Sequence, residues 1–186
     1  MDINRWVGTL RQHCSNTPIG VTTGAWAMPD VVSRLHEIDA WQELPDFASV
    51  NWHEDGADEV AAKLLERGFG VEAGIWHEQG LHAWAVSPRR SQCLRVVIEV
   101  QDMTPEKTRR VGRLLVDAVH TLEPQLPLLL HGEERSTWAA IELAGRLGLD
   151  TRAGLEDCLK LPNGVPASGN ADFVQSALSV YTSRLD

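Results

Sequence analysis

The chain has 186 residues, of which 43% are hydrophobic and 23% are charged, enough for one domain with a substantial core and too few for two large domains. It carries 17 Lys and Arg against 26 Asp and Glu, a net charge of −9. This balance argues against a nucleic acid or an anionic membrane surface as a partner, because both bind clustered Lys and Arg side chains.

Short apolar or β-branched runs alternate along the chain with longer segments of helical period. A first helix precedes them, with Ile3, Trp6, Leu10 and Cys14 expected on one face. Six strands are predicted, at residues 19–22, 47–51, 69–74, 94–99, 128–131 and 149–153. This alternation is typical of repeated βα units around a parallel sheet. Because no linker-like segment divides the units, we expect a single domain over residues 1–186.

The predicted helices carry recognisable end signals. Gly68 and Gly148 suit the left-handed conformation that often ends a helix. Thr104 followed by Pro105 combines an N-cap hydroxyl with a proline at the first helical position. Asn170 is predicted to cap the last helix. The apolar stripes expected to face the core are Val111, Leu114, Leu115, Ala118 and Leu122 after Thr104, and Phe173, Ala177, Leu178 and Tyr181 after Asn170.

Cysteine usage and the apolar runs suggest a compartment. Cys14, Cys93 and Cys158 are scattered and odd in number, which favours reduced core thiols over a disulfide framework. No segment has the pattern of a signal peptide, and the longest purely apolar runs are strand-sized rather than membrane-spanning. We therefore expect a cytoplasmic protein.

Two architectures fit six successive βα units. One is an open, doubly wound sheet, and the other is most of a (β/α)₈ barrel, which in complete form needs about 250 residues. Ligands bind at the carboxyl ends of the strands in both. The predicted strand ends and the loops after them hold Thr22, Asn51, Glu72, Glu99, His131, Arg152, Glu156 and Asp157.

Each of these residues also has a purely structural interpretation. Arg152, Glu156 and Asp157 could form an ordinary surface ion network. Glu72 could be a buried carboxylate paired with a base on a neighbouring strand, and His131 a hydrogen-bonded core histidine. His53 and Glu54, after the second strand, are interpreted as a helix-start pair. A P-loop, a Rossmann glycine motif and a G-x-S-x-G motif are all absent from the sequence, which disfavours nucleotide binding and serine hydrolysis.

Six short segments and one further residue, taken together, resemble a known family. The segments are 45–51, 70–76, 131–133, 137–138, 151–159 and 161–164, and the residue is Asn170. They are similar to the β-keto acid cleavage enzymes, the family of 3-keto-5-aminohexanoate cleavage enzyme. The element R-x-G-x-E-D at residues 152–157 is the most specific part of the likeness.

This resemblance implies a fold and a reaction. The fold would be a TIM barrel, here incomplete, with the six predicted strands corresponding to barrel strands three to eight. The reaction would convert a β-keto acid and acetyl-CoA into acetoacetate and a new acyl-CoA, assisted by a divalent metal, usually zinc. By this likeness we also expect a homo-oligomer acting on small molecules.

The same resemblance assigns roles to individual residues. Glu156 matches the metal-binding glutamate of the family. Arg152 and Asp157 match the catalytic arginine and aspartate. Thr22 matches a hydroxyl that holds the substrate, and the two substrate-binding residues with less defined roles are Asn51 and Glu72.

One departure from the family pattern concerns the metal. The family carries an H-x-H pair that supplies two metal ligands, and the seven histidines of this chain include no such pair. Catalytic zinc usually takes three protein ligands, so Glu156 alone would not hold it tightly. Two alternatives to an active acyltransferase lacking its N-terminal part therefore stay open: an inactive truncated remnant or interaction module, and a phosphate-binding barrel isomerase or lyase that uses Glu72 and His131.

Overall fold

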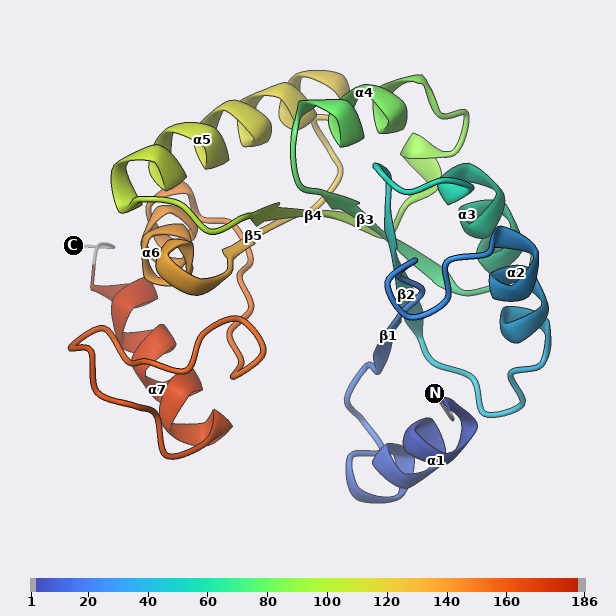
Figure 1. Ribbon diagram of the computed structural model, residues 1–186, viewed down its shortest axis with the longest axis horizontal. Coiled ribbons are helices and arrows are strands. Elements are labelled where there is room, and N and C mark those ends of the chain that lie inside the picture. Colours follow the sequence, from blue (N-terminus) through green and yellow to red (C-terminus); the bar gives the residue numbers. More distant parts are fainter. Residues whose placement is uncertain (1–2, 184–186) are drawn as a thin grey trace.

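The computed structural model describes residues 3–183, which contain one five-stranded parallel sheet with the strands side by side in chain order (Figure 1). The strands are β1 (Gly20–Thr22), β2 (Phe47–Asn51), β3 (Gly70–Ile75), β4 (Arg95–Val100) and β5 (Leu128–Gly132). Five of the six predicted strands are confirmed, with ends shifted by one residue at most. This α/β arrangement is consistent with part of a TIM-barrel-like fold.

The predicted sixth strand, 149–153, is wrong as a strand. Only Asp150 pairs with the sheet, where it bridges Leu129 and makes two backbone hydrogen bonds, to the N–H of Leu130 and the carbonyl oxygen of Leu128. The Thr151 hydroxyl then donates to the Leu130 carbonyl oxygen at 2.8 Å. Beyond this point the chain leaves the sheet edge, and the Arg152 side chain extends toward carboxylates on β4 and in the following loop.

Seven α-helices connect and flank the strands. They are α1 (Ile3–His13), α2 (Val31–Asp39), α3 (Ala57–Glu66), α4 (Glu78–Val86), α5 (Pro105–Leu122), α6 (Thr137–Leu147) and α7 (Asn170–Thr182), with short 3-10 turns η1 (Arg90–Gln92) and η2 (Glu134–Ser136). The sheet curves like an arch: α2 to α6 lie along its convex side, and α1 and α7 lie at its two ends (Figure 1). No helix among the described residues is long and apolar enough to cross a membrane.

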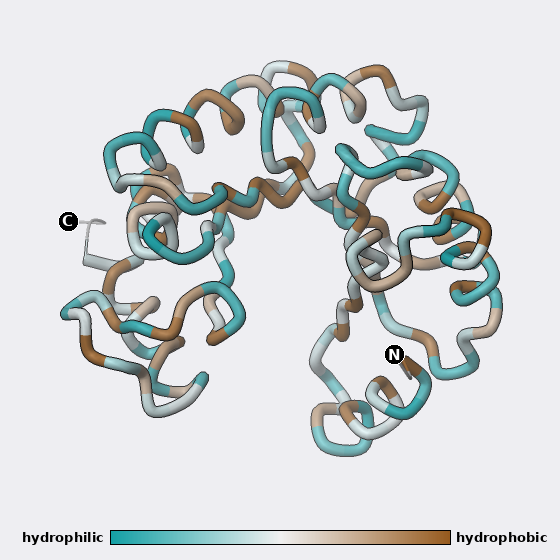
Figure 2. The backbone as a smooth tube through the Cα atoms, viewed as in Figure 1, coloured by the Kyte–Doolittle hydropathy of each residue, from teal (hydrophilic) through white to brown (hydrophobic). Residues whose placement is uncertain are grey.

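The two faces of the sheet have different chemistry. Alternate strand residues point to opposite faces, so one face of each strand packs under the helices. The side chains of that face are apolar and buried: Ala48, Val50, Val71, Ala73, Ile75, Val96, Ile98, Val100, Leu128 and Leu130. Figure 2 shows hydrophobic residues concentrated along the central strands. The opposite, concave face carries the polar residues Ser49, Glu72, Arg95, Glu99 and His131, and this face holds the candidate site.

Most of the predicted helix ends are confirmed. The Thr104 hydroxyl accepts a hydrogen bond from the Lys107 N–H at the start of α5, and Pro105 is its first residue. Gly68 and Gly148 follow α3 and α6 with φ of 81° and 64°, the left-handed conformation that glycine adopts without strain. Asn170 as an N-cap is wrong: it is the first residue of α7, and its side chain instead accepts a hydrogen bond from Leu155 N–H.

The predicted apolar faces of three helices are only partly buried. In α1 the buried residues are Ile3 and Val7, whereas Trp6 is 57% exposed. In α5, Leu114 is exposed, because the helix turns its Gly112 side toward the core and approaches the side chains of Leu143 and Leu130. Six residues of these predicted faces are exposed to solvent: Trp6, Leu10, Cys14, Leu114, Leu122 and Leu178.

Two of the three cysteines are buried as predicted. Burial raises the pKa of the Cys93 thiol to about 11, so at neutral pH it is a protonated core residue. Cys158 is also buried, while the prediction of a core thiol is wrong for Cys14, which is exposed just beyond α1.

We predict that Gly145→Ala destabilises the fold. A Cβ at Gly145 in α6 would overlap the backbone carbonyl oxygen of Tyr181 in α7. Separating the two helices should cost about 1–3 kcal/mol of unfolding free energy, measured by urea denaturation. Gly80→Ala in α4 is the control, since the nearest atom to its added Cβ is an ordinary 3.5 Å away. Equal stability of wild type and Gly145→Ala would contradict this packing.

Candidate functional site

Four charged side chains meet at the carboxyl ends of β4 and β5. His131 on β5 lies between Glu99 on β4 and Asp157 in the loop before α7: its Nε2 is 3.3 Å from Glu99 Oε2, and its Nδ1 is 3.4 Å from Asp157 Oδ1. Arg152 completes the group, with Nη2 at 3.5 Å from Asp157 Oδ1 and 3.9 Å from Glu99 Oε2. We call these four residues the mouth cluster.

His131 is the most enclosed member of the mouth cluster, with 1% of its side chain exposed. Burial alone would lower the pKa of its imidazole, and Arg152 acts in the same direction. The carboxylates of Asp157 and Glu99 outweigh both, so the pKa of His131 lies above its ordinary value of 6.5. The ring therefore gains a proton more readily here than in water.

Asp157 is held in place by its backbone as well as by its side chain. Its carbonyl oxygen accepts a 2.7 Å hydrogen bond from Glu134 N–H, and its own N–H donates to the Gly154 carbonyl oxygen. Burial opposes ionisation of the carboxyl group, but His131 and Arg152 prevail and lower its pKa below 3.8. One carboxylate oxygen, Oδ2, is buried without a hydrogen-bond partner in the described structure. Asp157 is thus an ionised carboxylate with a free acceptor atom.

Glu156, the residue that the resemblance assigns to the metal, does not join the mouth cluster. It is exposed, and its carboxylate folds back over Gly154. Within residues 3–183, no group of three or more His, Cys, Asp or Glu side chains is arranged to hold a metal ion. In the mouth cluster, both ring nitrogens of His131 already face carboxylate oxygens, which leaves no lone pair directed at a common centre. The described residues therefore do not fit a zinc site.

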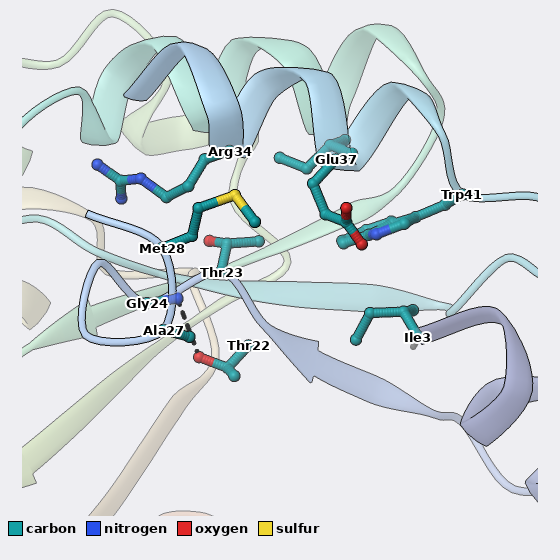
Figure 3. A pocket seen from close by; sticks show the side chains of 10 residues that line it. Ile3, Thr22, Thr23, Gly24, Ala27, Met28, Arg34, Glu37 and Trp41 are labelled. Carbon is teal, nitrogen blue, oxygen red and sulfur yellow. Dashed lines mark hydrogen bonds between the residues drawn. The ribbon is translucent and has the colours of Figure 1, made fainter. Parts of the chain in front are cut away.

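Thr22 and Asn51 are connected through a third residue, Glu54. The Thr22 hydroxyl accepts a hydrogen bond from Gly24 N–H at 3.1 Å (Figure 3). Glu54 accepts from the next backbone N–H, that of Ala25, at 2.8 Å, and from the Asn51 side-chain amide at 3.0 Å. Glu54 therefore fixes the loop after β1 against the end of β2, with the two predicted substrate-binding residues on either side.

Glu54 also forms the most buried arginine ion pair of the described structure. Its carboxylate lies 3.1 Å from Nη1 of Arg34, whose side chain is 3% exposed. Arg34 borders a small cavity of about 60 Å³ beneath α2, with Thr23 and Met28 next to it and Glu37 and Trp41 at the other end (Figure 3). The interpretation of Glu54 as part of a helix-start pair is wrong, since α3 begins at Ala57 after an N-cap glycine. Glu54 instead links the loop after β1 to the turn after β2.

Glu72 lies in a second charged group deeper in the concave face. Its carboxylate is 2.5 Å from the Arg95 guanidinium and accepts a 2.7 Å hydrogen bond from the Ser49 hydroxyl. No hydrogen bond or ion pair of the described residues joins this group to the mouth cluster. Glu72 and His131 consequently do not form a shared acid–base pair, and the isomerase or lyase alternative loses its geometric basis.

An open pocket lies beside the mouth cluster. It has a volume of about 370 Å³ and is bordered by Arg95, Leu129, Arg152 and the side of α7 that carries Val174 and Leu178. Asp150 also lines this pocket, and Arg95 is paired with Glu72, so Arg152 is the guanidinium best placed to bind a small organic anion there. Of the mouth cluster, sequence reasoning assigned catalytic roles to Arg152 and Asp157 by resemblance. It noted Glu99 and His131 only as polar residues at the ends of two adjacent strands, with His131 used in the isomerase or lyase alternative.

Comparison with known families identifies the family of the chain. A family model described as beta-keto acid cleavage enzyme matches residues 2–184. The chain therefore belongs to the β-keto acid cleavage enzyme family, whose members are generally metal-dependent and act on small molecules. A search among curated proteins found no match to this chain.

We predict that loss of the Arg95 charge lowers the free energy of unfolding more than loss of the Glu72 charge. Arg95→Met should cost about 3–5 kcal/mol of unfolding free energy, because it leaves the buried Glu72 carboxylate unpaired. Glu72→Gln should cost only about 1–3 kcal/mol, since the Arg95 side chain, 26% exposed, still reaches water. The double variant Arg95→Met/Glu72→Leu should recover most of the loss. A double variant less stable than Arg95→Met would refute the pairing.

The mouth cluster should give the fold a characteristic pH dependence. The raised pKa of His131 contributes stability that is complete below pH 6.5 and is lost as pH rises through the folded-state value. The lowered pKa of Asp157 contributes stability present above pH 3.8 and lost as pH falls through its folded-state value. Urea denaturation of wild type and His131→Gln across pH tests this. A variant that loses stability above pH 6.5 as steeply as wild type would contradict it.

Proposed function

We propose that the protein is an acyltransferase of the β-keto acid cleavage type, which converts a β-keto acid and acetyl-CoA into acetoacetate and a new acyl-CoA. The observation that carries this proposal is the pairing of Arg152 and Asp157, 3.5 Å apart, beside a pocket of about 370 Å³. These are the arginine and aspartate that the family resemblance assigns to catalysis.

Arg152 is suited to bind and polarise the substrate. Its side chain is 41% exposed and borders the pocket, so it reaches a bound molecule as well as Asp157. A planar guanidinium pairs with a carboxylate through two parallel hydrogen bonds. The same group stabilises the negative charge that develops on a carbonyl oxygen when the neighbouring methylene loses a proton.

Asp157 is suited to accept that proton. A methylene between two carbonyl groups is unusually acidic, and a carboxylate is a sufficient base once the enolate is stabilised. Asp157 is ionised because its pKa is lowered, and Oδ2 has no hydrogen-bond partner among the described residues. The proton of the methylene passes to the Asp157 carboxylate, and the electron pair remains on the enolate.

In the remaining steps, CoA passes from the acetyl group to the acyl group of the β-keto acid. The enolate carbon attacks the thioester carbonyl of acetyl-CoA, and the CoA thiolate leaves. The thiolate then attacks the original keto carbon, the carbon–carbon bond to the central methine breaks, and acyl-CoA is released. The proton held by Asp157 returns to the central carbon, which yields acetoacetate. Asn51, which donates a hydrogen bond to Glu54, and Thr22, which precedes the loop that Glu54 holds through Ala25 N–H, would orient the substrate at the same end of the strands.

The metal and the oligomeric state are separate proposals. The resemblance implies zinc with Glu156 as a ligand, but the described residues do not fit a zinc site, so no step above depends on one. A homo-oligomer is supported by the exposed apolar side chains of α1 and α7, including Trp6 and Leu178, since exposed apolar surface often marks an interface.

Activity of two variants tests the proposal. Purified protein is incubated with a β-keto acid and acetyl-CoA, with and without added Zn²⁺, and acetoacetate and acyl-CoA are quantified. Arg152→Lys and Asp157→Asn should each lower kcat by about 10²–10⁴-fold, because each removes a group that contacts the reacting atoms. Arg146→Lys on α6, whose arginine pairs only with Glu142 in the described structure, is the matched control and should retain wild-type activity.

Two results would contradict the proposal. Wild-type rates in both site variants would exclude the assigned roles. Wild-type protein that forms no acetoacetate under either metal condition would favour the alternative of an inactive remnant or interaction module, which the lack of a three-ligand metal group within residues 3–183 also suggests.

A further inference from the structure

The positions of the carboxylates around His131 indicate that its ring is doubly protonated. Its two ring nitrogens lie 3.3 and 3.4 Å from oxygens of two different carboxylates, at ion-pair distance although outside ideal hydrogen-bond geometry. A neutral imidazole carries one N–H and one lone pair. Its bare nitrogen would then face a carboxylate oxygen across a buried gap, which places two electron-rich atoms together. Only the imidazolium presents an N–H to both sides.

The charged groups that act on His131 come from two neighbouring parts of the fold. Glu99 belongs to β4, Asp157 and Arg152 to the segment between the sheet and α7, and His131 itself to β5. With a protonated ring, two carboxylates are balanced by two cations. With a neutral ring, both carboxylates would depend on Arg152 alone, and the cluster would carry a net negative charge next to the pocket.

We propose that His131 is a positioning residue whose fixed positive charge neutralises Glu99 and Asp157, so that the Arg152 guanidinium stays available for the carboxylate of an anionic substrate. This inference rests on the proposed function for the identity of that substrate. It assigns His131 no contact with the reacting atoms, because both of its ring nitrogens face carboxylate oxygens, those of Glu99 and Asp157. Its effect reaches the substrate through the charge that Arg152 experiences.

The test measures binding of two carboxylates, acetoacetate and acetate, at pH 7 by isothermal titration calorimetry. His131→Gln keeps a polar side chain without the charge, and it should weaken the binding of both anions by about tenfold or more. Glu99→Gln in the His131→Gln background removes one negative charge and should restore affinity to within about threefold of wild type. His120→Gln, at an exposed histidine near the end of α5, is the control and should bind like wild type.

The outcomes separate this inference from the proposed function. Equal affinity of wild type and His131→Gln overturns the role of His131 and leaves the acyltransferase proposal untouched. A double variant as weak as His131→Gln also overturns it, because the loss would then reflect structure rather than charge. Acetate bound as tightly as acetoacetate by wild type, with the predicted charge dependence, contradicts recognition of β-keto acids while supporting His131. Wild type that binds neither anion overturns both.

Discussion

The imidazole ring of His131 lies between the carboxylates of Glu99 and Asp157, and the arrangement of the candidate site depends on these two contacts. Buried carboxylates repel each other unless a cation separates them, and His131 is the cation that the fold supplies from β5. Because Asp157 is oriented in this way, its second carboxylate oxygen stays unpaired, and Arg152 projects into the pocket. The buried group of His131 and two carboxylates thus leaves the more exposed Arg152 side chain available to bind a ligand.

A second buried ion pair organises the other side of the strand ends. Arg34 and Glu54 join α2 to the turn after β2, and Glu54 also holds the backbone after Thr22 and the side chain of Asn51. Loops are the most variable part of a βα framework, so precise placement of side chains on them requires fixed connections. The two ion groups act as such connections, which explains why carboxylates are concentrated at this end of an otherwise apolar sheet.

The sequence was sufficient for the parallel sheet and most helix ends, because strand periodicity, Thr104 and the left-handed glycines are local signals. It was insufficient for the rotation of α1 and α5, since Gly112 allows a close approach that the apolar stripe does not encode. Residues 149–153 have a strand-like composition, yet only Asp150 pairs with the sheet. The sequence analysis noted Glu99 and Glu54 but not their ion-pair partners, because those partners lie far away in sequence.

The central claim is that a doubly protonated His131 separates two ionised carboxylates. Nitrogen-15 NMR of selectively labelled protein at pH 7, with His131→Gln to assign the signal, measures this directly. The account predicts that both ring nitrogens of His131 resonate in the protonated range and that Glu99→Gln makes the ring lose its proton at lower pH. One protonated and one unprotonated nitrogen in the wild type at pH 7 would contradict it.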